Sequence, residues 1–447
     1  MKVLLLNQCF WPDVMATGRQ LTGVARGLAE RGHEVTVIAS RRGYDDAQLR
    51  FPRRERWNGI DIVRLPTVSL GKTTRWRRAL NFASFSAACV WRLAITRRQD
   101  AVVALTSPPL ISWLASLFTR LKGGRMIFWV MDLNPDEAIA AGWLKPDSVT
   151  ARLLSALLKS SMQHAEKVVV LDRFMKERIA AKGISEPKIE VIPPSCDNSV
   201  EYDREGREAF RRRHDLSEKF VVMYAGNHSP CHPLDTLLEA AKELRARADI
   251  AFCFAGGGSE LGKVNEFARL NQLENILCLP YQAEAELPGM LSAADLHVVV
   301  MGEGFSGIVH PSKIYNILAV GAPFLYIGPA ESHLADIVSG LPQRASSARH
   351  GEVEFVVQAI FKRAERFRSD RGAETSVADP LHLRSQTEVC ATTAVSRFIG
   401  LIELSDAEIM DAAQTSGNLE SAYRATGANM RSVPPASARG SDTQLVG

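Results

Sequence analysis

The chain has 447 residues, more than one hydrophobic core usually supports, so its length predicts two domains of roughly 150–200 residues with appendages. Apolar residues make up 46% and charged residues 23%, the balance of a soluble globular protein, and no stretch reaches the ~18–20 apolar residues of a membrane span. The net charge of only +4 indicates no particular partner, and we expect no nucleic acid.

The seven cysteines are scattered and include no CxxC pair. This pattern argues against a disulfide framework or a zinc site and favours a reducing cytosol. The first apolar run, residues 3–6, is too short for a signal peptide and reads as a strand. We therefore expect a cytoplasmic protein.

The first half of the chain alternates short apolar runs with amphipathic stretches, which predicts a doubly wound α/β domain with a parallel sheet. The dinucleotide fingerprint GxGxxG is absent. The expected strands are 3–6, 35–39, 60–65, 101–105, 125–129, 167–171 and 190–192, and the expected helices are 20–30, 151–161 and 172–182.

Residues 72–98 form a basic segment in which aromatic and aliphatic side chains alternate with arginines. Such a helix can lie on an anionic membrane surface. It can equally be a surface helix that packs its aromatic side chains on the sheet. Both interpretations stay open, and the first would place the protein peripherally on the inner face of the cell membrane.

A second α/β series follows the Pro-rich spot at residues 193–195. Its expected strands are 220–224, 250–255, 276–279, 296–300 and 324–327, and its expected helices are 234–246, 260–271, 286–294 and about 354–366. A last helix is expected at 388–404, before a tail rich in Ala, Ser, Gly and Thr. The predicted parts are domains at 1–196 and 197–382, a C-terminal helix at 383–404 and a disordered tail at 405–447.

The stretch from Glu303 to Gly321 combines a glycine-broken loop with a helix that begins at Ser312-Lys313. The N-terminus of a helix presents free N–H groups and the positive dipole end, and Lys313 adds a charge, so the stretch suits a phosphate or diphosphate. The alternative is a plain capped helix with a solvated lysine.

Two doubly wound domains would face each other across a cleft and bring the carboxyl ends of both sheets, where loops bind ligands, around it. Several polar or glycine-rich pieces stand at these ends. They are Thr17-Gly18, Asp132, Arg173, Asn227-His228, Gly256–Gly258, Tyr281-Gln282 and Glu303–Lys313.

Four phrases occur in a telling order: FWPDVMATGRQLTGVARGLAERGHEVTVI, WVMDLNPDEAIAAGWLK, YAGNHSPCHPLDTLLEAA and HPSKIYNILAVGAP. Through them the chain resembles the bacterial GT-B glycosyltransferases of family 4, and the resemblance covers most of residues 1–340. It implies the GT-B fold, in which the first domain presents the acceptor and the second binds a nucleoside-diphosphate sugar. It also implies that the C-terminal helix crosses back to the first domain.

The resemblance implies roles for individual residues. Gly18, beside Thr17, would approach the sugar and diphosphate, Lys313 and Ser312 would hold the diphosphate, and Gly307-Ile308 would lie against it. The base and ribose would lie at Gly256–Gly258, with Gly257 at the centre, and at Tyr281-Gln282.

Three further candidates carry open alternatives. Asp132 either caps a strand end or orients the acceptor and accepts its proton. Glu303 is either a solvated acid or a contact for the donor-sugar hydroxyls. His310 is expected to be structural.

The sequence departs from the family pattern at two places. Pro230 and His232 stand where an arginine and a lysine are common, and Asn316 stands where a second glutamate contacts the ribose. A subset with a Pro-Ser-Lys-x-Tyr phrase shares this loss. The second cation at the diphosphate is therefore open, with Arg173, His228 and His232, beside Asn227, as candidates. The alternative for the two histidines is a loop position with hydrogen bonds to the backbone.

The resemblance implies an enzyme, a retaining glycosyltransferase that moves a hexose or N-acetylhexosamine from a nucleotide sugar, with UDP expected, to a glycan or polyprenyl-linked acceptor in cell-surface polysaccharide synthesis. We expect no cofactor besides this co-substrate. No Asp-x-Asp pair stands in a suitable loop, so we also expect no metal. Two alternatives stay open: a sugar-nucleotide 2-epimerase on the same scaffold, and a non-catalytic GT-B scaffold subunit.

Overall fold

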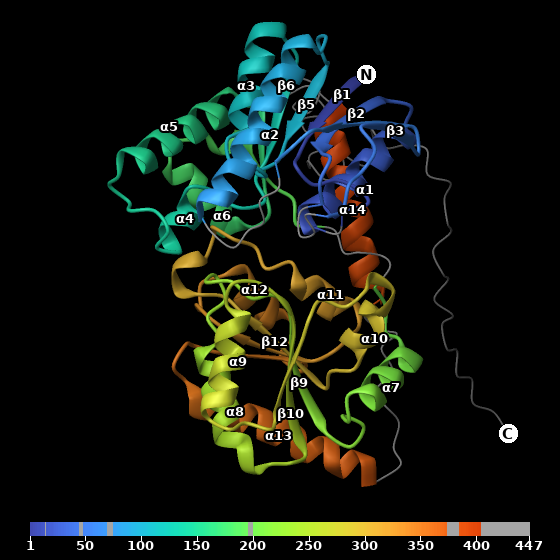
Figure 1. Ribbon diagram of the computed structural model, residues 1–447, viewed down its shortest axis with the longest axis vertical. Helices are drawn as coiled ribbons and strands as arrows, with labels where there is room; N and C mark the ends of the chain where they lie inside the picture. The colour runs from blue at the N-terminus through green and yellow to red at the C-terminus, as the bar shows by residue number, and fades with distance from the viewer. Residues whose placement is uncertain (14, 44–47, 69–74, 195–199, 373–383, 404–447) are drawn as a thin grey trace, which may run out of the picture. The chain divides into compact units, whose positions relative to one another are not determined.

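The computed structural model describes residues 1–13, 15–43, 48–68, 75–194, 200–372 and 384–403. Within them the chain forms two sheets, one of eight strands in the blue-to-green part of Figure 1 and one of six in the green-to-orange part. The expected tail at 405–447 lies outside the described residues. The expected limits at 196, 382 and 404 also fall on residues outside these ranges, so the domain boundaries stay predictions.

The first sheet has the strand order β3-β4-β2-β1-β5-β6-β7-β8. All neighbours pair in parallel except β3, which runs antiparallel to β4. Because β1 lies between β2 and β5, the order reverses there, and loops after these strands can meet at a topological switch point. The strands are β1 (Lys2–Leu6), β2 (Glu34–Ser40), β3 (Arg54–Trp57), β4 (Ile60–Leu65), β5 (Ala101–Ala104), β6 (Arg125–Trp129), β7 (Lys167–Val170) and β8 (Ile189–Val191).

The helices of this part form where the sequence turns amphipathic. Along α1, Leu21, Val24, Ala25 and Leu28 are buried, which is the spacing of one helix face. Besides the 3-10 turn, three elements were not anticipated: β3, a short polar strand at the sheet edge, α3, whose apolar stretch follows Pro108-Pro109, and the short helix α4. The helices are α1 (Ala16–Glu30), α2 (Arg75–Ile95), α3 (Ile111–Lys122), α4 (Asp136–Ala140), α5 (Val149–His164), α6 (Arg173–Ala181) and the 3-10 turn η1 (Glu186–Lys188).

The second sheet is fully parallel and has the order β11-β10-β9-β12-β13-β14. Its switch point lies between β9 and β12, so the segments after these two strands meet. The strands are β9 (Phe220–Asn227), β10 (Ile250–Gly257), β11 (Ile276–Leu279), β12 (Leu296–Val300), β13 (Phe324–Ile327) and β14 (Ala345–Ala348).

Helices cover both faces of this sheet, as alternate residues of β9 show. Val222 packs in one cluster with residues of α8 and α13, and Val221 packs in another with residues of α7 and α10. The unanticipated elements are α7, α12 and β14. The helices are α7 (Arg204–Arg213), α8 (Asp235–Glu243), α9 (Leu261–Leu270), α10 (Leu287–Ser292), α11 (Lys313–Ala319), α12 (His333–Gly340) and α13 (Val353–Gly372), with 3-10 turns η2 (Leu244–Ala246), η3 (Glu284–Glu286) and η4 (Glu303–Phe305).

The expected last helix is present as α14 (Arg384–Glu403). Its Val395 lies 3.8 Å from the position that a Cβ at Gly23 of α1 would take.

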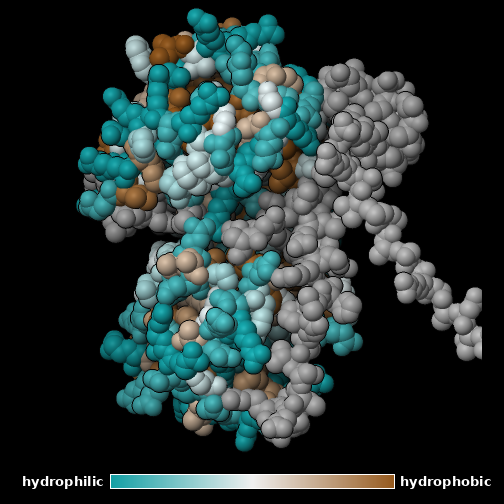
Figure 2. Space-filling model, turned by 90° about the vertical axis from the view of Figure 1, so that its right-hand side faces the viewer, coloured by the Kyte–Doolittle hydropathy of each residue, from teal (hydrophilic) through white to brown (hydrophobic). Residues whose placement is uncertain are grey.

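Hydrophobic packing is continuous between the two sheet-bearing parts. One buried cluster contains Leu133 and Met175 of the first part together with Phe305 and Ile308 of the second. The surface is different in character: Figure 2 shows a mostly hydrophilic face on which hydrophobic side chains gather only in small separate groups. No helix among the described residues is long and apolar enough to span a bilayer.

Candidate functional site

Lys313 is the first residue of α11, beside the switch point of the second sheet. Its Nζ donates a hydrogen bond of 2.6 Å to the Tyr224 hydroxyl and lies 3.9 Å from the centre of that ring. The hydroxyl in turn donates to the carbonyl of Asn227 at 2.9 Å, which holds it at the end of β9. Tyr224, which the sequence places inside an apolar strand, therefore positions the ammonium group.

Two buried histidines accompany this pair. His228 is fully buried and its ring packs edge-on against Tyr224 at 4.9 Å. Neither ring nitrogen makes a hydrogen bond of good geometry among the described residues, although the backbone of Gly257 and Gly226 lies near enough to act on its pKa. His232 is also buried, and its Nδ1 likewise lacks a partner there. Buried polar atoms are usually satisfied, so these nitrogens point to a ligand.

Burial sets the charge of this group, which we call the Lys313 pocket: Lys313, Tyr224, His228 and His232. Burial lowers the pKa of Lys313 to about 7. Burial, followed by the neighbouring Lys313, lowers the pKa of His228 to about 4 and that of His232 well below its usual value. Burial raises the pKa of the Tyr224 hydroxyl well above 10. Near neutral pH the two histidines and the tyrosine thus carry no charge, and Lys313 is only partly protonated.

Glycines at the ends of β9 and β10, which we call the glycine floor, lie beside the pocket. In the β9–β10 pairing Gly256 faces Gly226, and a Cβ at Gly256 would lie 2.0 Å from the Gly226 carbonyl oxygen. A Cβ at Gly258 would lie 2.2 Å from the carbonyl oxygen of His228, and one at Gly257 would lie 2.8 Å from the Tyr281 ring. These glycines let two strand ends and an exposed tyrosine approach one another closely.

Asp132 follows β6 and belongs to a small acidic group. Burial, followed by Glu137, raises the pKa of Asp132 to about 7. Cys231, between the two pocket histidines in sequence, donates from Sγ to Oε1 of Glu137 at 3.8 Å, and Asp132 helps to raise the pKa of its thiol. Cys231 also interacts with Lys313, so it lies between the acidic group and the Lys313 pocket.

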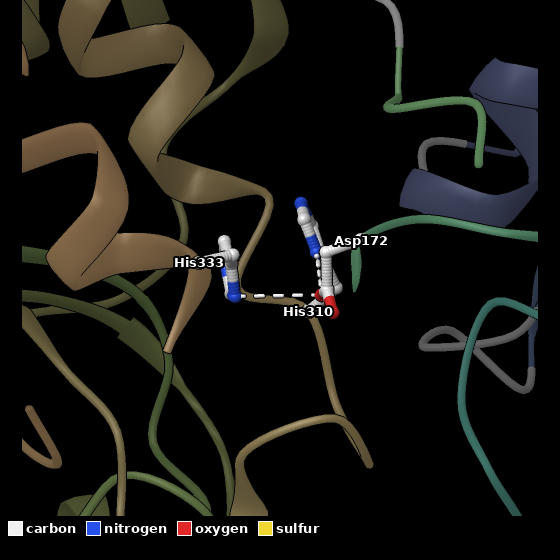
Figure 3. Close-up of side chains that lie close together, drawn as sticks. All are labelled: Asp172, His310 and His333. Atoms are coloured by element: carbon white, nitrogen blue, oxygen red, sulfur yellow. Dashed lines mark hydrogen bonds and ion pairs between the residues drawn. The ribbon is translucent and has the colours of Figure 1, made fainter. Parts of the chain in front are cut away.

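A buried cluster that sequence reasoning did not find joins the two sheet-bearing parts (Figure 3). Asp172 caps α6 and accepts the Met175 N–H at 2.8 Å, while its Oδ2 lies 2.8 Å from Nδ1 of His310. The His333 ring stacks on His310 at 3.8 Å, and its Nδ1 lies 3.5 Å from the same carboxylate oxygen. His310 also reaches the Tyr315 hydroxyl at 2.8 Å, so it has the structural surroundings expected of it.

This cluster has the composition of a metal site, since its three potential ligand atoms lie within 4.8 Å of one another. However, the two imidazole planes are inclined by only 16°. The in-plane lone pairs of stacked rings run side by side and do not converge on one ion. The arrangement fits a hydrogen-bonded junction, in which hydrogen bonds and the two histidines hold the pKa of Asp172 below its usual value against the opposing effect of burial.

Some predicted site residues lie elsewhere. The Arg173 guanidinium forms two hydrogen bonds to the Asp336 carboxylate, at 2.8 and 3.0 Å, and no described contact joins it to Lys313. Gly307 packs on the backbone of Phe174, where a Cβ would lie 2.6 Å from the carbonyl oxygen. The Ile308 carbonyl accepts the Leu133 N–H at 2.9 Å. Arg173, Gly307 and Ile308 thus make contacts between the two sheet-bearing parts of the chain.

The remaining candidates are placed without a described ligand contact. Gly18 is buried and a Cβ there would meet the backbone of Cys9 at 3.3 Å, while Thr17 is half-buried. Glu303 is exposed in η4, Gln282 donates to its neighbour Pro280, and Asn316 is half-buried in α11. Ser312 precedes α11 but its side chain does not cap the helix.

Comparisons with known proteins agree with this fold. A protein family described as glycosyl transferase 4-like domain matches residues 16–195. The chain is 26% identical over 376 residues to the putative colanic acid biosynthesis glycosyl transferase WcaI of Escherichia coli K12, covering 80% of this chain and 91% of that protein. It is 27% identical over 244 residues to the probable glycosyltransferase WbjE of Pseudomonas aeruginosa, covering 54% of this chain and 60% of that protein.

Among solved structures, HepE of Anabaena in complex with UDP and glucose is similar with a TM-score of 0.65 and 13% identity, over 91% of this chain and all of that chain (100%). The GT-B fold is thereby confirmed. The comparisons support a GT-B glycosyltransferase of the family 4 type. The chain is therefore a transferase enzyme, a glycosyltransferase, while its place in the Pro-Ser-Lys-x-Tyr subset stays a prediction.

Proposed function

We propose that this glycosyltransferase transfers a hexose or N-acetylhexosamine from a UDP-linked sugar, with retention at the anomeric carbon, to a glycan or polyprenyl-linked acceptor in cell-surface polysaccharide synthesis. One observation carries the proposal. A half-buried lysine stands at a switch point beside two buried histidines, and both ring nitrogens of His228 and Nδ1 of His232 lack well-formed hydrogen bonds among the described residues, a set of donors suited to a diphosphate.

The relatives support the donor and the pathway class. HepE is described in complex with UDP, with UDP-glucose, and with UDP and glucose. WcaI is described as acting in colanic acid biosynthesis, and the structurally similar WaaG in lipopolysaccharide biosynthesis. A nucleotide sugar and a surface glycan are the matching substrate classes for this chain.

The chemistry proposed for the site is charge stabilisation. The acceptor oxygen bonds to the anomeric carbon, the bond from that carbon to the diphosphate oxygen breaks, and the electron pair leaves with the nucleoside diphosphate. Lys313 and the pocket histidines would stabilise the negative charge that develops there. Positive charge from the protein would serve without a metal ion.

Asp132 is proposed to receive the proton that the acceptor hydroxyl loses. A base whose pKa lies near 7 suits this task, because it is substantially ionised near neutral pH and still holds a proton well. Glu303, which is exposed in η4, is proposed to contact donor-sugar hydroxyls.

A membrane-facing acceptor is proposed from α2. Its Leu80, Val90, Trp91 and Ile95 are exposed although they are large and apolar, while Phe85 faces the core. An apolar stripe beside arginines is typical of helices that lie in the membrane interface. The part of the basic segment at 72–74 lies outside the described residues.

The proposal is tested by assaying release of nucleoside diphosphate from UDP-sugars with wild-type protein and Lys313→Ala, using membrane lipid extract as the acceptor source. The wild type should release UDP in an acceptor-dependent way, and the variant should lose at least roughly a hundredfold in turnover. The thermal melting curve of the variant should stay close to that of the wild type. Full activity of Lys313→Ala would contradict the proposal that the diphosphate binds in this pocket.

The same reactions separate the alternatives. Appearance of a second sugar from UDP-GlcNAc without any acceptor would indicate an epimerase. Failure to bind any nucleoside diphosphate would indicate a scaffold subunit.

A further inference from the structure

The Lys313 ammonium lacks a carboxylate partner among the described residues. Its described interactions are the hydrogen bond to Tyr224 and an electrostatic interaction with Cys231. Gly226 brings backbone close to the side chain, with a Cβ position 3.4 Å from Cε and 3.6 Å from Nζ. Lys313 is half-buried against a fully buried tyrosine and histidine, and an ammonium withdrawn from water without a counter-charge is costly.

The neighbouring histidines increase the free-energy cost of protonating Lys313. His228 and His232 both interact electrostatically with Lys313 and with each other, and charge on one disfavours charge on the next. Two buried histidines and a half-buried lysine are therefore gathered in one place. Their pKa values, about 7 for Lys313 and about 4 for His228, agree with a pocket that sheds its protons when empty.

The tyrosine and the cysteine that face the pocket carry no charge near neutral pH. Tyr224 on β9 and Cys231 in the loop after it both have raised pKa values because they are buried. Tyr281, in the loop after β11, interacts electrostatically with Tyr224. On the side of the first sheet the acids are Asp132 and Glu137, which interact with Cys231 and do not pair with Lys313.

We propose that Lys313, His228 and His232 form a proton-coupled anion site, in which the diphosphate of the donor and a proton enter together. This inference rests on the proposed function, because it takes the anion to be the donor's diphosphate. The empty pocket avoids an uncompensated buried charge, and the arriving diphosphate supplies the missing counter-charge. Lys313 then becomes a full ammonium, and His228 and Nδ1 of His232, which lack well-formed hydrogen bonds among the described residues, lie beside it as donors.

Because diphosphate binding and proton uptake are coupled, the affinity for the diphosphate should depend on pH. An arriving anion raises the pKa of Lys313 above its value in the empty pocket, so binding takes up a proton between the two pKa values. Above pH 7 the affinity should therefore fall by up to about tenfold per pH unit. A site built on permanently charged groups would keep a constant affinity over the same range.

The test is calorimetric titration of the full-length chain with UDP, ADP and GDP between pH 7.5 and 9.0. In this pH range the phosphates of UDP, ADP and GDP are essentially fully ionised, because the second proton of a phosphate dissociates near pH 6. Titrations at one pH in HEPES and in Tris, which differ in heat of ionisation, count the protons taken up. We expect close to one proton at pH 8 and an affinity that falls as the pH rises.

Two substitutions test whether Lys313 is the group that takes up the proton when UDP binds. Lys313→Arg keeps a cation that does not titrate, so UDP binding should lose its proton uptake and its pH dependence. His228→Leu keeps the volume but removes two nitrogens, and should weaken UDP binding by roughly tenfold. The matched control is His214→Gln, a histidine at the end of α7 that packs on Phe210; it should change neither quantity.

The outcomes are distinguishable. If UDP binds with the same heat in both buffers and a constant affinity from pH 7.5 to 9.0, the proton-coupled site is wrong and the proposed function stands. Full proton uptake by Lys313→Arg would overturn the proton-coupled site in the same way. If none of the three nucleoside diphosphates binds the wild type, the proposed function and this inference are both overturned.

Discussion

At the scale of single residues, Lys313 could be found from the sequence and its surroundings could not. A lysine after Pro-Ser at the start of an apolar helix pattern is a visible signal. However, α11 has only seven residues and no side-chain cap, so the helix end contributes less than expected. Tyr224 and Cys231 were missed because an apolar strand and a loop cysteine both look like ordinary core residues. Their importance depends on contacts across 89 and 94 residues of sequence.

Tyr224→Phe tests the positioning of Lys313. The substitution removes the hydroxyl that accepts from Nζ but keeps the ring, so the fold should persist and Lys313 should lose its fixed position. One lost hydrogen bond of about 1 kcal/mol predicts roughly a fivefold weaker donor affinity or turnover. Steady-state kinetics with varied UDP-sugar measures both. Kinetics identical to the wild type would show that Tyr224 is a packing residue only.

At the scale of elements, the alternation of apolar strands and amphipathic helices predicted most of both sheets. The misses have physical reasons. The edge strand β3 is polar and therefore has no apolar period, and α7 is so rich in arginine that it reads as a solvated stretch. In fact Arg211 of α7 is buried and bonds to Asp295 at 2.9 Å, a pairing across the fold that no local pattern announces.

The glycine floor at the ends of β9 and β10 provides a test at this scale. Gly256 has a φ of +136° and no room for a Cβ, so Gly256→Ala should destabilise the protein by about 2–4 kcal/mol and impair donor binding. Gly262 of α9 has nothing within 4 Å of its Cβ position. Gly262→Ala should therefore stabilise slightly, by about 0.5–1 kcal/mol.

Urea unfolding midpoints and UDP titration of the two variants check this prediction. The pair is matched in chemistry and differs only in backbone and space. Equal stability of both variants would mean that the β9–β10 ends are not closely packed.

At the scale of the whole molecule, the sequence predicted two similar α/β parts but did not reveal what joins them. Asp172 and His310 are separated by 138 residues and Arg173 and Asp336 by 163, and side-chain pairs so far apart leave no local pattern. Arg173, Gly307 and Ile308 were expected at the diphosphate, which stays a prediction, and in the structure they make such contacts. They stand at loop ends, where a ligand contact and a contact between the parts look alike in sequence.

Buried histidines predict how the stability of the molecule depends on pH. Burial lowers the pKa of His228, His232, His297 and His333 in the folded chain. Below about pH 6.5 the unfolded chain binds protons that the folded chain refuses, so stability should fall as the pH falls. Each histidine should contribute up to about 1.4 kcal/mol per pH unit.

Melting temperatures at pH 7.5 and 5.5 measure this loss. His333→Gln should show a smaller drop than the wild type between these two pH values, because one of the four contributions is gone. A wild-type melting temperature that is equal at both pH values would contradict the burial of these side chains as neutral groups.

A crystal structure of the protein with UDP bound tests most directly whether the diphosphate binds at the Lys313 pocket. We predict both phosphates there, with oxygens within hydrogen-bond distance of Nζ of Lys313 and of a ring nitrogen of His228. A diphosphate bound elsewhere, with the Lys313–Tyr224 pair and the His228 ring untouched, would contradict this assignment.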